Sequence, residues 1–387
     1  MNKKELELYI HIPFCVRKCS YCDFLSAPAT EQTREAYMAA LFAEIGGRAK
    51  DYSERTVTSI FIGGGTPSLL SGEQIGQLMD RIREQFAMAQ DAEITMEVNP
   101  GTASAEKLRN FYTAGINRLS IGMQSAQAEE LKNLGRIHDF EGFCQVYREA
   151  VEAGFTNINV DIMSGLPGQT LASYRDTLEK VLHLEPMPQH ISAYSLIVEE
   201  GTPFAAMAER GELPLPEEET ERAMYEETIE VLAKYGFHRY EISNYARDGY
   251  ECRHNVGYWI RRDYLGFGIG AASLIDNVRF QNEKSLGAYL AHPLESREEE
   301  QTLTVQDRME ETMFLGLRLT RGVSCVDFAE QYGRTVEEVY GEVIARNVAD
   351  GLLTVTERKE NQKKDRFLAL TKRGLDLSNY VMAQFLF

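Results

Sequence analysis

The segment Tyr9–Phe24 reads YIHIPFCVRKCSYCDF, and it places three of the chain's six cysteines at the spacing C-x3-C-x2-C. These are Cys15, Cys19 and Cys22. Thiolates so close in sequence can bind either zinc or an iron–sulfur cluster, because both take soft sulfur ligands. A structural zinc site needs four protein ligands, and a four-iron cluster needs one ligand for each iron. Three cysteines leave one position open to a ligand that is not protein, which indicates a reactive centre.

Two other interpretations of these cysteines stay open on the residues alone. His11 can complete a zinc site, although it alternates with apolar residues in an expected strand that runs into Pro13. The three cysteines can also be unrelated core residues, but their clustering argues against that. The ligand count favours a cluster-binding loop.

The composition is that of an ordinary globular protein, with 387 residues of which 43% are hydrophobic and 26% charged. This length predicts one large domain and a smaller one. The net charge of −18 argues against non-specific binding to nucleic acid or to an anionic membrane surface. The N-terminus lacks the apolar core of a signal peptide, and no stretch has the length of a membrane span. Since Cys144, Cys252 and Cys325 are scattered singly, we expect a reducing, cytoplasmic location.

Strand-like and helical segments alternate through the first half of the chain. Six segments have the length and apolar content of strands: Leu6–Pro13, Val57–Ile62, Glu93–Val98, Arg118–Met123, Asn157–Met163 and His190–Leu196. Repeated βα units predict a parallel sheet, closed or partly closed as a barrel. The predicted fold class is therefore α/β.

Polar residues follow several of these strands. The loop Gly63–Thr66 and the side chains of Glu97, Gln124 and Asp161 lie at or near the C-terminal ends of consecutive expected strands. In barrels the loops at that end converge and bind ligands. Glycines let backbone groups approach a ligand closely, because they lack a Cβ. The glycine loop alone can be a tight turn and Glu97 alone an edge carboxylate, but together these residues predict a ligand site.

The string YIHIPFC with the three-cysteine motif resembles the radical S-adenosylmethionine (SAM) superfamily, in which C-x3-C-x2-C holds a [4Fe-4S] cluster and SAM binds the fourth iron. It is most similar to the branch that contains the oxygen-independent coproporphyrinogen III oxidases and their haem-chaperone relatives. The resemblance covers essentially the whole chain and is most specific at Tyr9–Phe24, Gly63–Pro67 and His254–Trp259. It implies a partial (β/α)6 radical SAM barrel with a small C-terminal winged-helix-like domain.

The resemblance also implies roles for individual residues. Cys15, Cys19 and Cys22 match the cluster ligands. The residues that match SAM-binding positions are Tyr9, Tyr21, Gly64, Gly65, Thr66, Glu97, Gln124, Arg136 and Asp161. Gln124, Arg136 and Asp161 match positions that surround a second SAM molecule in the decarboxylating enzymes. No catalytic residue is assigned.

A second informative segment is Tyr240–Ser273, which holds the only tryptophan in the string HNVGYW, residues 254–259. A single histidine in an expected loop is more often a surface residue than a ligand. Histidine beside flat aromatic rings nevertheless suits haem, because imidazole binds the iron and the rings pack on the macrocycle. The string resembles the motif of the haem-chaperone branch, which implies haem binding by His254, Tyr258 and Trp259.

Two differences between this chain and the oxidases bear on which branch it resembles more. The oxidases carry a fourth cysteine two residues past the cluster motif, where this chain has Phe24, and an N-terminal extension before the string that begins here at Tyr9. Both departures favour a chaperone that binds a [4Fe-4S] cluster, SAM and haem and delivers the haem to apo-haemoproteins. The alternative is an oxygen-independent oxidase that decarboxylates coproporphyrinogen III to protoporphyrinogen IX. Whether the chain is an enzyme stays open.

Three parts are expected along the chain: a barrel over residues 1–200, a barrel extension with the haem motif over 201–295, and a helical, winged-helix-like domain over 296–387. In the last part, helical patterns over Gln306–Leu319, Cys325–Tyr332 and Val336–Asp350 precede two strand-like runs, Leu352–Thr356 and Arg366–Leu370. A DNA-reading helix should be basic, but residues 335–350 carry four acidic residues and one arginine. A redox-sensing DNA regulator is therefore the weaker hypothesis, and we expect a partner-docking module.

The expected partners follow from the chaperone hypothesis. They are haem or a porphyrin as cargo, apo-haemoprotein recipients and an electron donor, with no nucleic acid. No membrane span is expected, although transient membrane contact fits recipients that are membrane enzymes.

Overall fold

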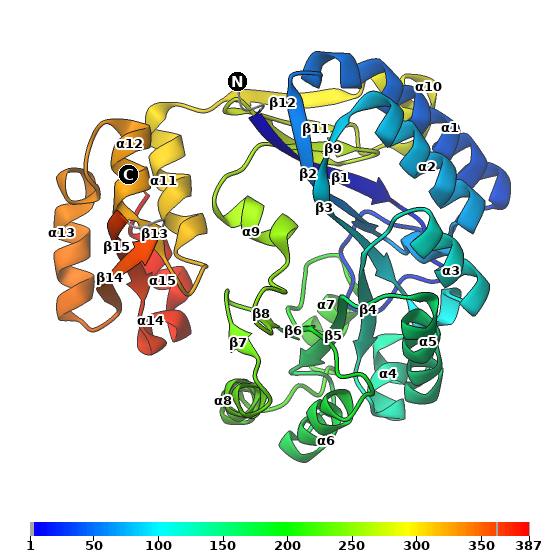
Figure 1. The fold of residues 1–387 in the computed structure, drawn as a ribbon. Coiled ribbons are helices and arrows are strands. Elements are labelled where there is room, and N and C mark those ends of the chain that lie inside the picture. The colour runs from blue at the N-terminus through cyan, green and yellow to red at the C-terminus, as the bar shows by residue number, and fades with distance from the viewer. Residues whose placement is uncertain (1–3, 361–362, 387) are drawn as a thin grey trace.

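The computed structural model describes residues 4–360 and 363–386. A strongly curved sheet with helices outside it forms the main body, and a small C-terminal body lies opposite its concave side (Figure 1). Within the described residues, the main sheet has twelve strands in the order β12-β11-β10-β9-β1-β2-β3-β4-β5-β6-β8-β7. Its end strands β12 and β7 are not neighbours, so the sheet is open.

The six consecutive strands β1 to β6 pair in parallel, as the sequence predicts. Their bounds are β1 Lys4–Ile12, β2 Arg55–Gly64, β3 Ala87–Val98, β4 Arg118–Gln124, β5 Ile158–Ser164 and β6 His190–Ser195. The sheet continues at both edges with β7 His238–Arg239, β8 Asn244–Ala246, β9 Tyr264–Phe267, β10 Ala272–Ile275, β11 Val278–Asn282 and β12 Arg297–Thr302. Strand β9 is parallel to β1, and the other added strands are antiparallel to their neighbours. The predicted partial α/β barrel is thus confirmed, with edges that the sequence pattern missed.

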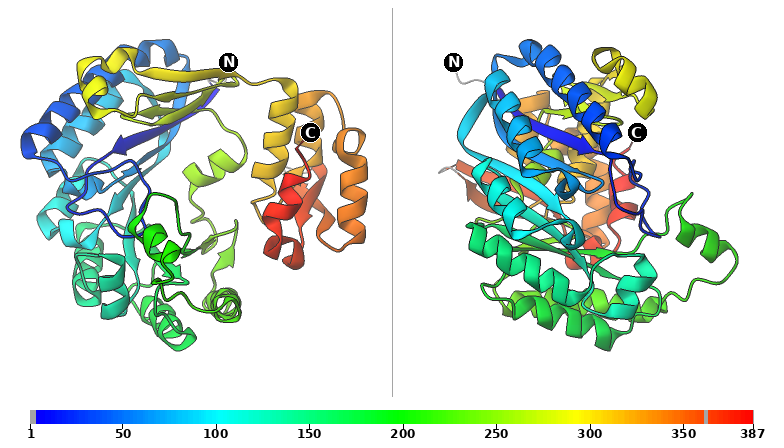
Figure 2. Two further views of the ribbon diagram at one scale, coloured as in Figure 1. Left: turned by 180° about the vertical axis from the view of Figure 1, so that it is seen from behind. Right: turned by 90° about the vertical axis from the view of Figure 1, so that its right-hand side faces the viewer.

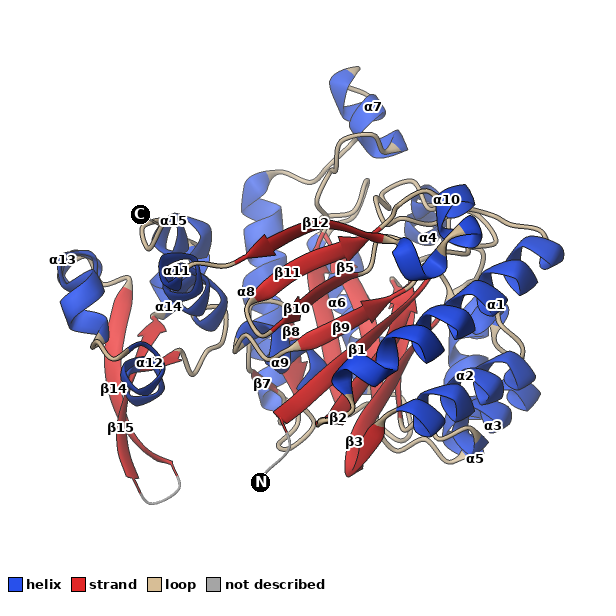
Figure 3. Ribbon diagram, turned by 90° about the horizontal axis from the view of Figure 1, so that it is seen from above, coloured by secondary structure: helices blue, strands red, loops and turns tan. Residues whose placement is uncertain are grey.

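Helices cover the outer face of the sheet (Figures 1 and 3). They are α1 Glu31–Arg48, α2 Gly72–Gln85, α3 Ala105–Thr113, α4 Ala128–Leu134, α5 Phe140–Ala153 and α6 Leu171–Leu182. Five of them begin after a Ser, Thr or Asp whose side chain accepts a backbone N–H of the first turn: Thr30, Ser71, Ser104, Asp139 and Thr170. Such caps satisfy N–H groups that have no partner inside the helix, which is why the helices start there.

The part between β6 and β12 carries four more helices. They are α7 Pro203–Glu209, α8 Glu218–Lys234, α9 Arg253–Trp259 and α10 Leu286–Ala291. Helix α7 projects from the main body, whereas α9 lies inside the curve of the sheet and faces the C-terminal body (Figures 1 and 2). Short 3-10 turns lie at Ala49–Tyr52, Pro67–Leu69, Pro100–Thr102 and Pro293–Glu295.

The C-terminal body has its own apolar core, which includes Met313, Leu317, Phe328 and Val381. Its elements are α11 Val305–Gly316, β13 Val323–Ser324, α12 Cys325–Tyr332, α13 Val336–Ala349, β14 Leu353–Glu360, β15 Lys363–Leu370, α14 Lys372–Asp376 and α15 Ser378–Ala383. Three helices followed by a β-hairpin form the expected winged-helix-like arrangement, although the hairpin is longer than the two short runs predicted. Strand β12, in a segment assigned by sequence to this part, pairs with β11 of the main sheet.

Among the described residues, no helix has the length and apolar character needed to span a membrane.

A buried polar cluster ties α1 to the added strands. The Glu44 carboxylate accepts hydrogen bonds from the backbone of Gly268 at 2.9 Å, from Asn282 at 2.7 Å and from Tyr289 at 2.6 Å. It also pairs with Arg48 at 2.7 Å, and the two side chains are 0% and 5% exposed. Because buried charges are costly unless they are paired and hydrogen-bonded, this cluster holds α1 in one position on the sheet.

We predict that Glu44→Gln destabilises the protein by about 3–5 kcal/mol, because it leaves the buried Arg48 guanidinium without its counter-ion. Chemical denaturation followed by circular dichroism measures this loss. Glu44→Gln with Arg48→Met should recover part of it, and Glu129→Gln, in an exposed pair with Lys132, should cost little. An unchanged unfolding midpoint for Glu44→Gln alone would contradict the prediction.

Candidate functional site

The glycine loop after β2 holds the start of the cysteine loop in place. The N–H of Gly65 donates to the carbonyl of Ile12 at 2.9 Å, and the N–H of Thr66 donates to the carbonyl of Phe14 at 2.7 Å. A Cβ on Gly65 would lie 2.7 Å from the oxygen of Phe14 and 2.9 Å from that of Ile12. Only glycine permits this approach, since both oxygens belong to the backbone and cannot move without shifting the chain. The Thr66 hydroxyl lies 3.5 Å from the sulfur of Cys15.

The far side of the cysteine loop is held by α4 and the segment after it. The N–H of Ser20 donates to the carbonyl of Leu134 at 3.0 Å. The guanidinium of Arg17 donates to the carbonyl of Gly135 at 2.7 Å. The guanidinium of Arg136 lies 3.8 Å from the sulfur of Cys19 and donates to a backbone carbonyl of β4. Positive charge thus lies beside the cysteines, where it would offset the negative charge of a cluster bound by thiolates.

A cavity of about 310 Å³ opens at the C-terminal ends of the parallel strands. All three motif cysteines line it. So do all residues that the sequence assigned to SAM except Tyr9: Tyr21, Gly64, Gly65, Thr66, Glu97, Gln124, Arg136 and Asp161. Tyr9 lines a neighbouring cavity. The structure therefore brings together residues that lie up to 146 positions apart, from Cys15 to Asp161.

Further residues of this cavity were missed in the sequence. They are Arg118 and Ser120 of β4, Asn159 of β5, and Ser192 and Tyr194 of β6. Each is separated by an even number of positions from another residue of the same strand that lines the cavity: Arg118 and Ser120 from Gln124, Asn159 from Asp161, and Ser192 from Tyr194. Because side chains alternate across a sheet, polar residues at this period identify the inward face. That alternation was the signal that could have found them.

The carboxylates of the cavity are held in defined environments. Glu97 accepts the N–H of Gly64 at 3.0 Å, and Asp161 accepts the side-chain amide of Asn159 at 2.7 Å. Burial, followed by the negative charge of Asp161, raises the pKa of Glu97 to about 7. Gln124 has a left-handed backbone, with φ 68°, at a register irregularity of β4. Such strain in a non-glycine residue is typical of functional sites.

The donor set fits an iron–sulfur cluster better than a single metal ion. No group of three His, Cys, Asp or Glu side chains in residues 4–360 and 363–386 is arranged to hold one metal ion. A four-iron cluster instead takes one thiolate per iron, so its ligands surround a larger object. Both ring nitrogens of His11 have other partners, the Tyr9 hydroxyl at 3.0 Å and the Leu25 carbonyl at 2.8 Å. These contacts do not favour the zinc site completed by His11.

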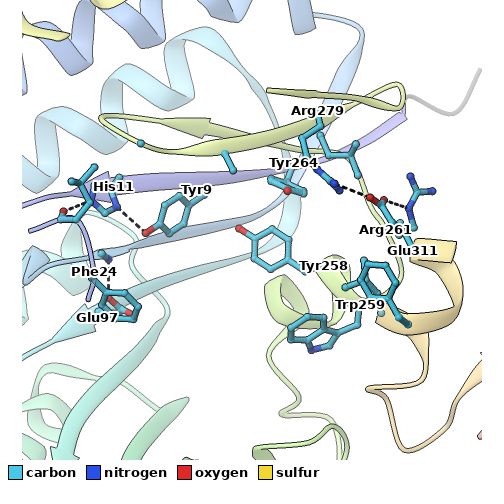
Figure 4. Close-up of a pocket in the computed structure, with 17 residues that line it drawn as sticks. Tyr9, His11, Phe24, Glu97, Tyr258, Trp259, Arg261, Tyr264, Arg279 and Glu311 are labelled. Atoms are coloured by element: carbon cyan, nitrogen blue, oxygen red, sulfur yellow. Dashed lines mark hydrogen bonds and ion pairs between the residues drawn. The ribbon is translucent and has the colours of Figure 1, made fainter. Parts of the chain in front are cut away.

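A second cavity, of about 650 Å³, adjoins the first, and Phe24, Gly64 and Glu97 line both. It extends from β1 to the C-terminal body (Figure 4). Most of its remaining wall is aromatic or apolar: Tyr9, Leu25, Tyr258, Trp259, Tyr264, Leu274, Phe314 and Leu315. Three charged side chains, Arg261, Arg279 and Glu311, lie together at its far end (Figure 4).

The expected loop around the HNVGYW string is wrong, because residues 253–259 form helix α9. Its first turn is held by a residue distant in sequence. The Glu93 carboxylate of β3 accepts the backbone N–H groups of Arg253 and His254, each at 3.1 Å. Gly257 faces the sheet, where a Cβ would overlap the carboxylate of Glu7. The helix therefore depends on contacts that no local pattern reveals.

The three residues predicted to bind haem lie in different surroundings. Tyr258 and Trp259 line the larger cavity, but His254 is only 1% exposed. The His254 ring stacks on Phe61, and its nitrogens contact the Ser59 hydroxyl at 2.8 Å and the Tyr258 hydroxyl at 3.0 Å. Burial, together with nearby guanidinium groups, lowers the pKa of His254 to about 3. The ring is therefore neutral, as metal ligation requires, and the Tyr258 side chain separates it from the cavity.

Residues 9–181 match the radical SAM superfamily, and residues 303–377 match the HemN C-terminal domain. A solved structure of coproporphyrinogen III oxidase (HemN) from Escherichia coli, described as a radical SAM enzyme, superimposes with a TM-score of 0.84. It shares 28% sequence identity, and the match covers 99% of this chain and 90% of that one. The fold and the site together define a radical SAM protein with a HemN-type C-terminal domain.

Relatives narrow this class further. The haem chaperone HemW of Bacillus subtilis is 38% identical over 98% of both chains, and that of Lactococcus lactis is 36% identical over 100% of this chain and 98% of its own. The haem chaperone HemW of Escherichia coli is 37% identical over 90% of this chain and 92% of its own. The chain belongs to the HemW family of radical SAM proteins, the branch that the sequence motifs predict.

We predict that Gly65→Ala lowers the iron and sulfide bound after anaerobic reconstitution to less than about half of the wild-type value, because the Cβ pushes the glycine loop off the cysteine loop. Colorimetric iron and sulfide assays measure the change. Gly76→Ala is a matched control, since a Cβ there meets no atom within 4 Å. Equal iron in Gly65→Ala and wild type would show that the backbone contact does not position the cysteines.

Proposed function

We propose that this protein binds a [4Fe-4S] cluster and SAM in the smaller cavity and haem in the larger one, and delivers the haem to apo-haemoproteins. One observation carries the proposal: the two cavities share Phe24, Gly64 and Glu97 as a common wall. A cofactor site and a cargo site in contact allow each ligand to affect the binding of the other.

The cluster and SAM assignment rests on the donor set and on family membership. Cys15, Cys19 and Cys22 line one cavity with Arg17 and Arg136, whose charges offset those of thiolates. Glu97 and Asp161 offer carboxylate acceptors, and the glycine loop offers backbone groups. When bound, the cluster and SAM would supply one-electron chemistry, while these residues bind the cofactors and orient them.

The haem assignment rests on the shape and chemistry of the larger cavity. Its volume of about 650 Å³ lies within the range of cofactor sites, and its walls are mainly aromatic and aliphatic. Tyr258 and Trp259 provide ring surfaces for a macrocycle. For His254 to bind the iron, its Nε2 must leave the Tyr258 hydroxyl, so we assign Tyr258 as the residue that controls access to His254.

A second candidate function is the oxygen-independent oxidation of coproporphyrinogen III. The observation in its favour is the fold match to HemN over nearly the whole chain. Anaerobic conversion of coproporphyrinogen III to protoporphyrinogen IX by the reconstituted protein would establish it. Phe24, at the position of the oxidases' fourth cysteine, favours the chaperone.

The proposal also covers location and partners. A cytoplasmic location suits the six cysteines, which are all free thiols in the structure, because a reducing compartment keeps them so. The recipients are apo-haemoproteins, and an electron donor is needed if the cluster is to be reduced.

We predict saturable haem binding that His254→Ala weakens by at least about tenfold and Tyr258→Phe strengthens, because the phenylalanine frees Nε2 of the histidine. An anaerobic titration of the reconstituted protein, followed at the Soret band, measures both affinities. His183→Ala, at an exposed histidine, serves as the control.

Absence of haem binding would contradict the chaperone function. Equal binding by wild type and His254→Ala would remove His254 as the iron ligand while leaving the cavity as the haem site. Coproporphyrinogen turnover without haem binding would favour the second candidate.

A further prediction concerns pH. Because the pKa of Glu97 is raised to about 7, its carboxylate becomes ionised as the pH rises through 7. The anion attracts the cationic SAM more strongly than the neutral acid does, so affinity should increase about tenfold between pH 6 and pH 8. Glu97→Gln should remove this difference. Calorimetric titrations of both proteins at the two pH values measure it, and parallel pH profiles would contradict the role of Glu97.

A further inference from the structure

The far end of the larger cavity holds an unusual charge arrangement. Glu311, on α11 of the C-terminal body, accepts Nε of Arg261 at 2.8 Å on one oxygen and Nη1 of Arg279 at 2.7 Å on the other. Figure 4 shows the carboxylate between the two guanidinium groups. Two positive charges face one negative charge, so the group carries a formal charge of +1.

Arg261 is positioned there by the end of α9. It lies two residues after the helix in a left-handed conformation, with φ 56°, and the N–H of Arg262 donates to the carbonyl of Gly257 at 2.9 Å, which is typical of a helix C-terminus. Its side chain is only 4% exposed, yet its Nη2 has no hydrogen-bond partner among the described residues. A buried N–H donor without a partner is unfavourable, and it indicates a group that binds an acceptor from a ligand.

The remaining residues that line the larger cavity indicate what kind of ligand would carry this hydrogen-bond acceptor. Aromatic and aliphatic side chains surround the space between this charged end and the wall shared with the smaller cavity. A ligand that fills it must combine a large apolar body with anionic groups at one edge. A tetrapyrrole with propionate side chains has this chemistry, and carboxylates bind arginine through paired, charge-assisted hydrogen bonds.

We propose that Arg261 and Arg279 form the carboxylate-binding end of the haem site, where the propionates of the tetrapyrrole replace the carboxylate of Glu311. This assignment rests on the proposed function, since it takes haem as the ligand of the larger cavity. It adds the residues that orient the macrocycle, with its propionates at Arg261 and its iron toward α9. Glu311 then acts as a competing carboxylate that lowers haem affinity.

The test compares two forms of one ligand on the full chain. Haem and haem dimethyl ester are titrated anaerobically into wild type, Arg261→Gln, Arg279→Gln and Glu311→Gln, with Soret absorbance as the readout. Wild type should bind haem at least about tenfold more tightly than the ester, since the ester lacks the anionic acceptors. Each arginine variant should reduce that ratio toward one, and Glu311→Gln should bind haem more tightly than wild type does. Arg175→Gln, at an exposed arginine paired with Glu227, should match wild type.

The possible results distinguish an error in the carboxylate-binding site from an error in the proposed haem-binding function. If wild type binds haem but binds the ester equally well, the carboxylate site is wrong and the haem function stands. If wild type binds neither form, both are wrong. The ester comparison in wild type decides the matter even if Arg261→Gln fails to fold, and Glu311→Gln tests the competing carboxylate independently.

Discussion

Two backbone hydrogen bonds, from Gly65 to Ile12 and from Thr66 to Phe14, carry the geometry of the site. They join the end of β1 to the loop after its neighbour β2, so the cysteine loop begins at a defined point of the sheet. A side chain at Gly65 would occupy the space of these bonds. The cysteine loop has little secondary structure of its own, so these bonds fix the position at which it begins. A metal cluster bound by this loop requires such a fixed position.

The interior of the curved sheet is polar around the smaller cavity, and the polar groups there are largely paired with one another. Buried His190 joins the side chains of Asn159 and Tyr240, at 2.6 and 2.8 Å, and Asn159 in turn donates to Asp161. Such groups are costly to bury unless they are hydrogen-bonded. Because these bonds connect neighbouring strands, the side chains that face the smaller cavity are positioned by the sheet itself, before any ligand is present.

The six parallel strands and their alternation with helices could be predicted from the sequence, because apolar periodicity is a local signal. The cysteine motif and the polar residues after strands were local signals too, and the structure collects nearly all of them in one cavity. Helix α9 could not be predicted, since its first turn depends on Glu93, some 160 positions away. Arg261 and Glu311 were likewise missed, because only the packing of the C-terminal body against the sheet brings them together.

The ion pairs of Glu311 have a mechanical consequence. Arg261 and Glu311 belong to different bodies and are 4% and 7% exposed, so this ion pair is buried where the two bodies meet. Other contacts also join the bodies, among them the ion pair of Arg222 with Asp376 at 3.1 Å and the stacking of Arg318 on Trp259. An anion that takes the place of Glu311 would therefore loosen one point of attachment and leave the others in place, so occupancy of the cavity is coupled to how closely the C-terminal body is held.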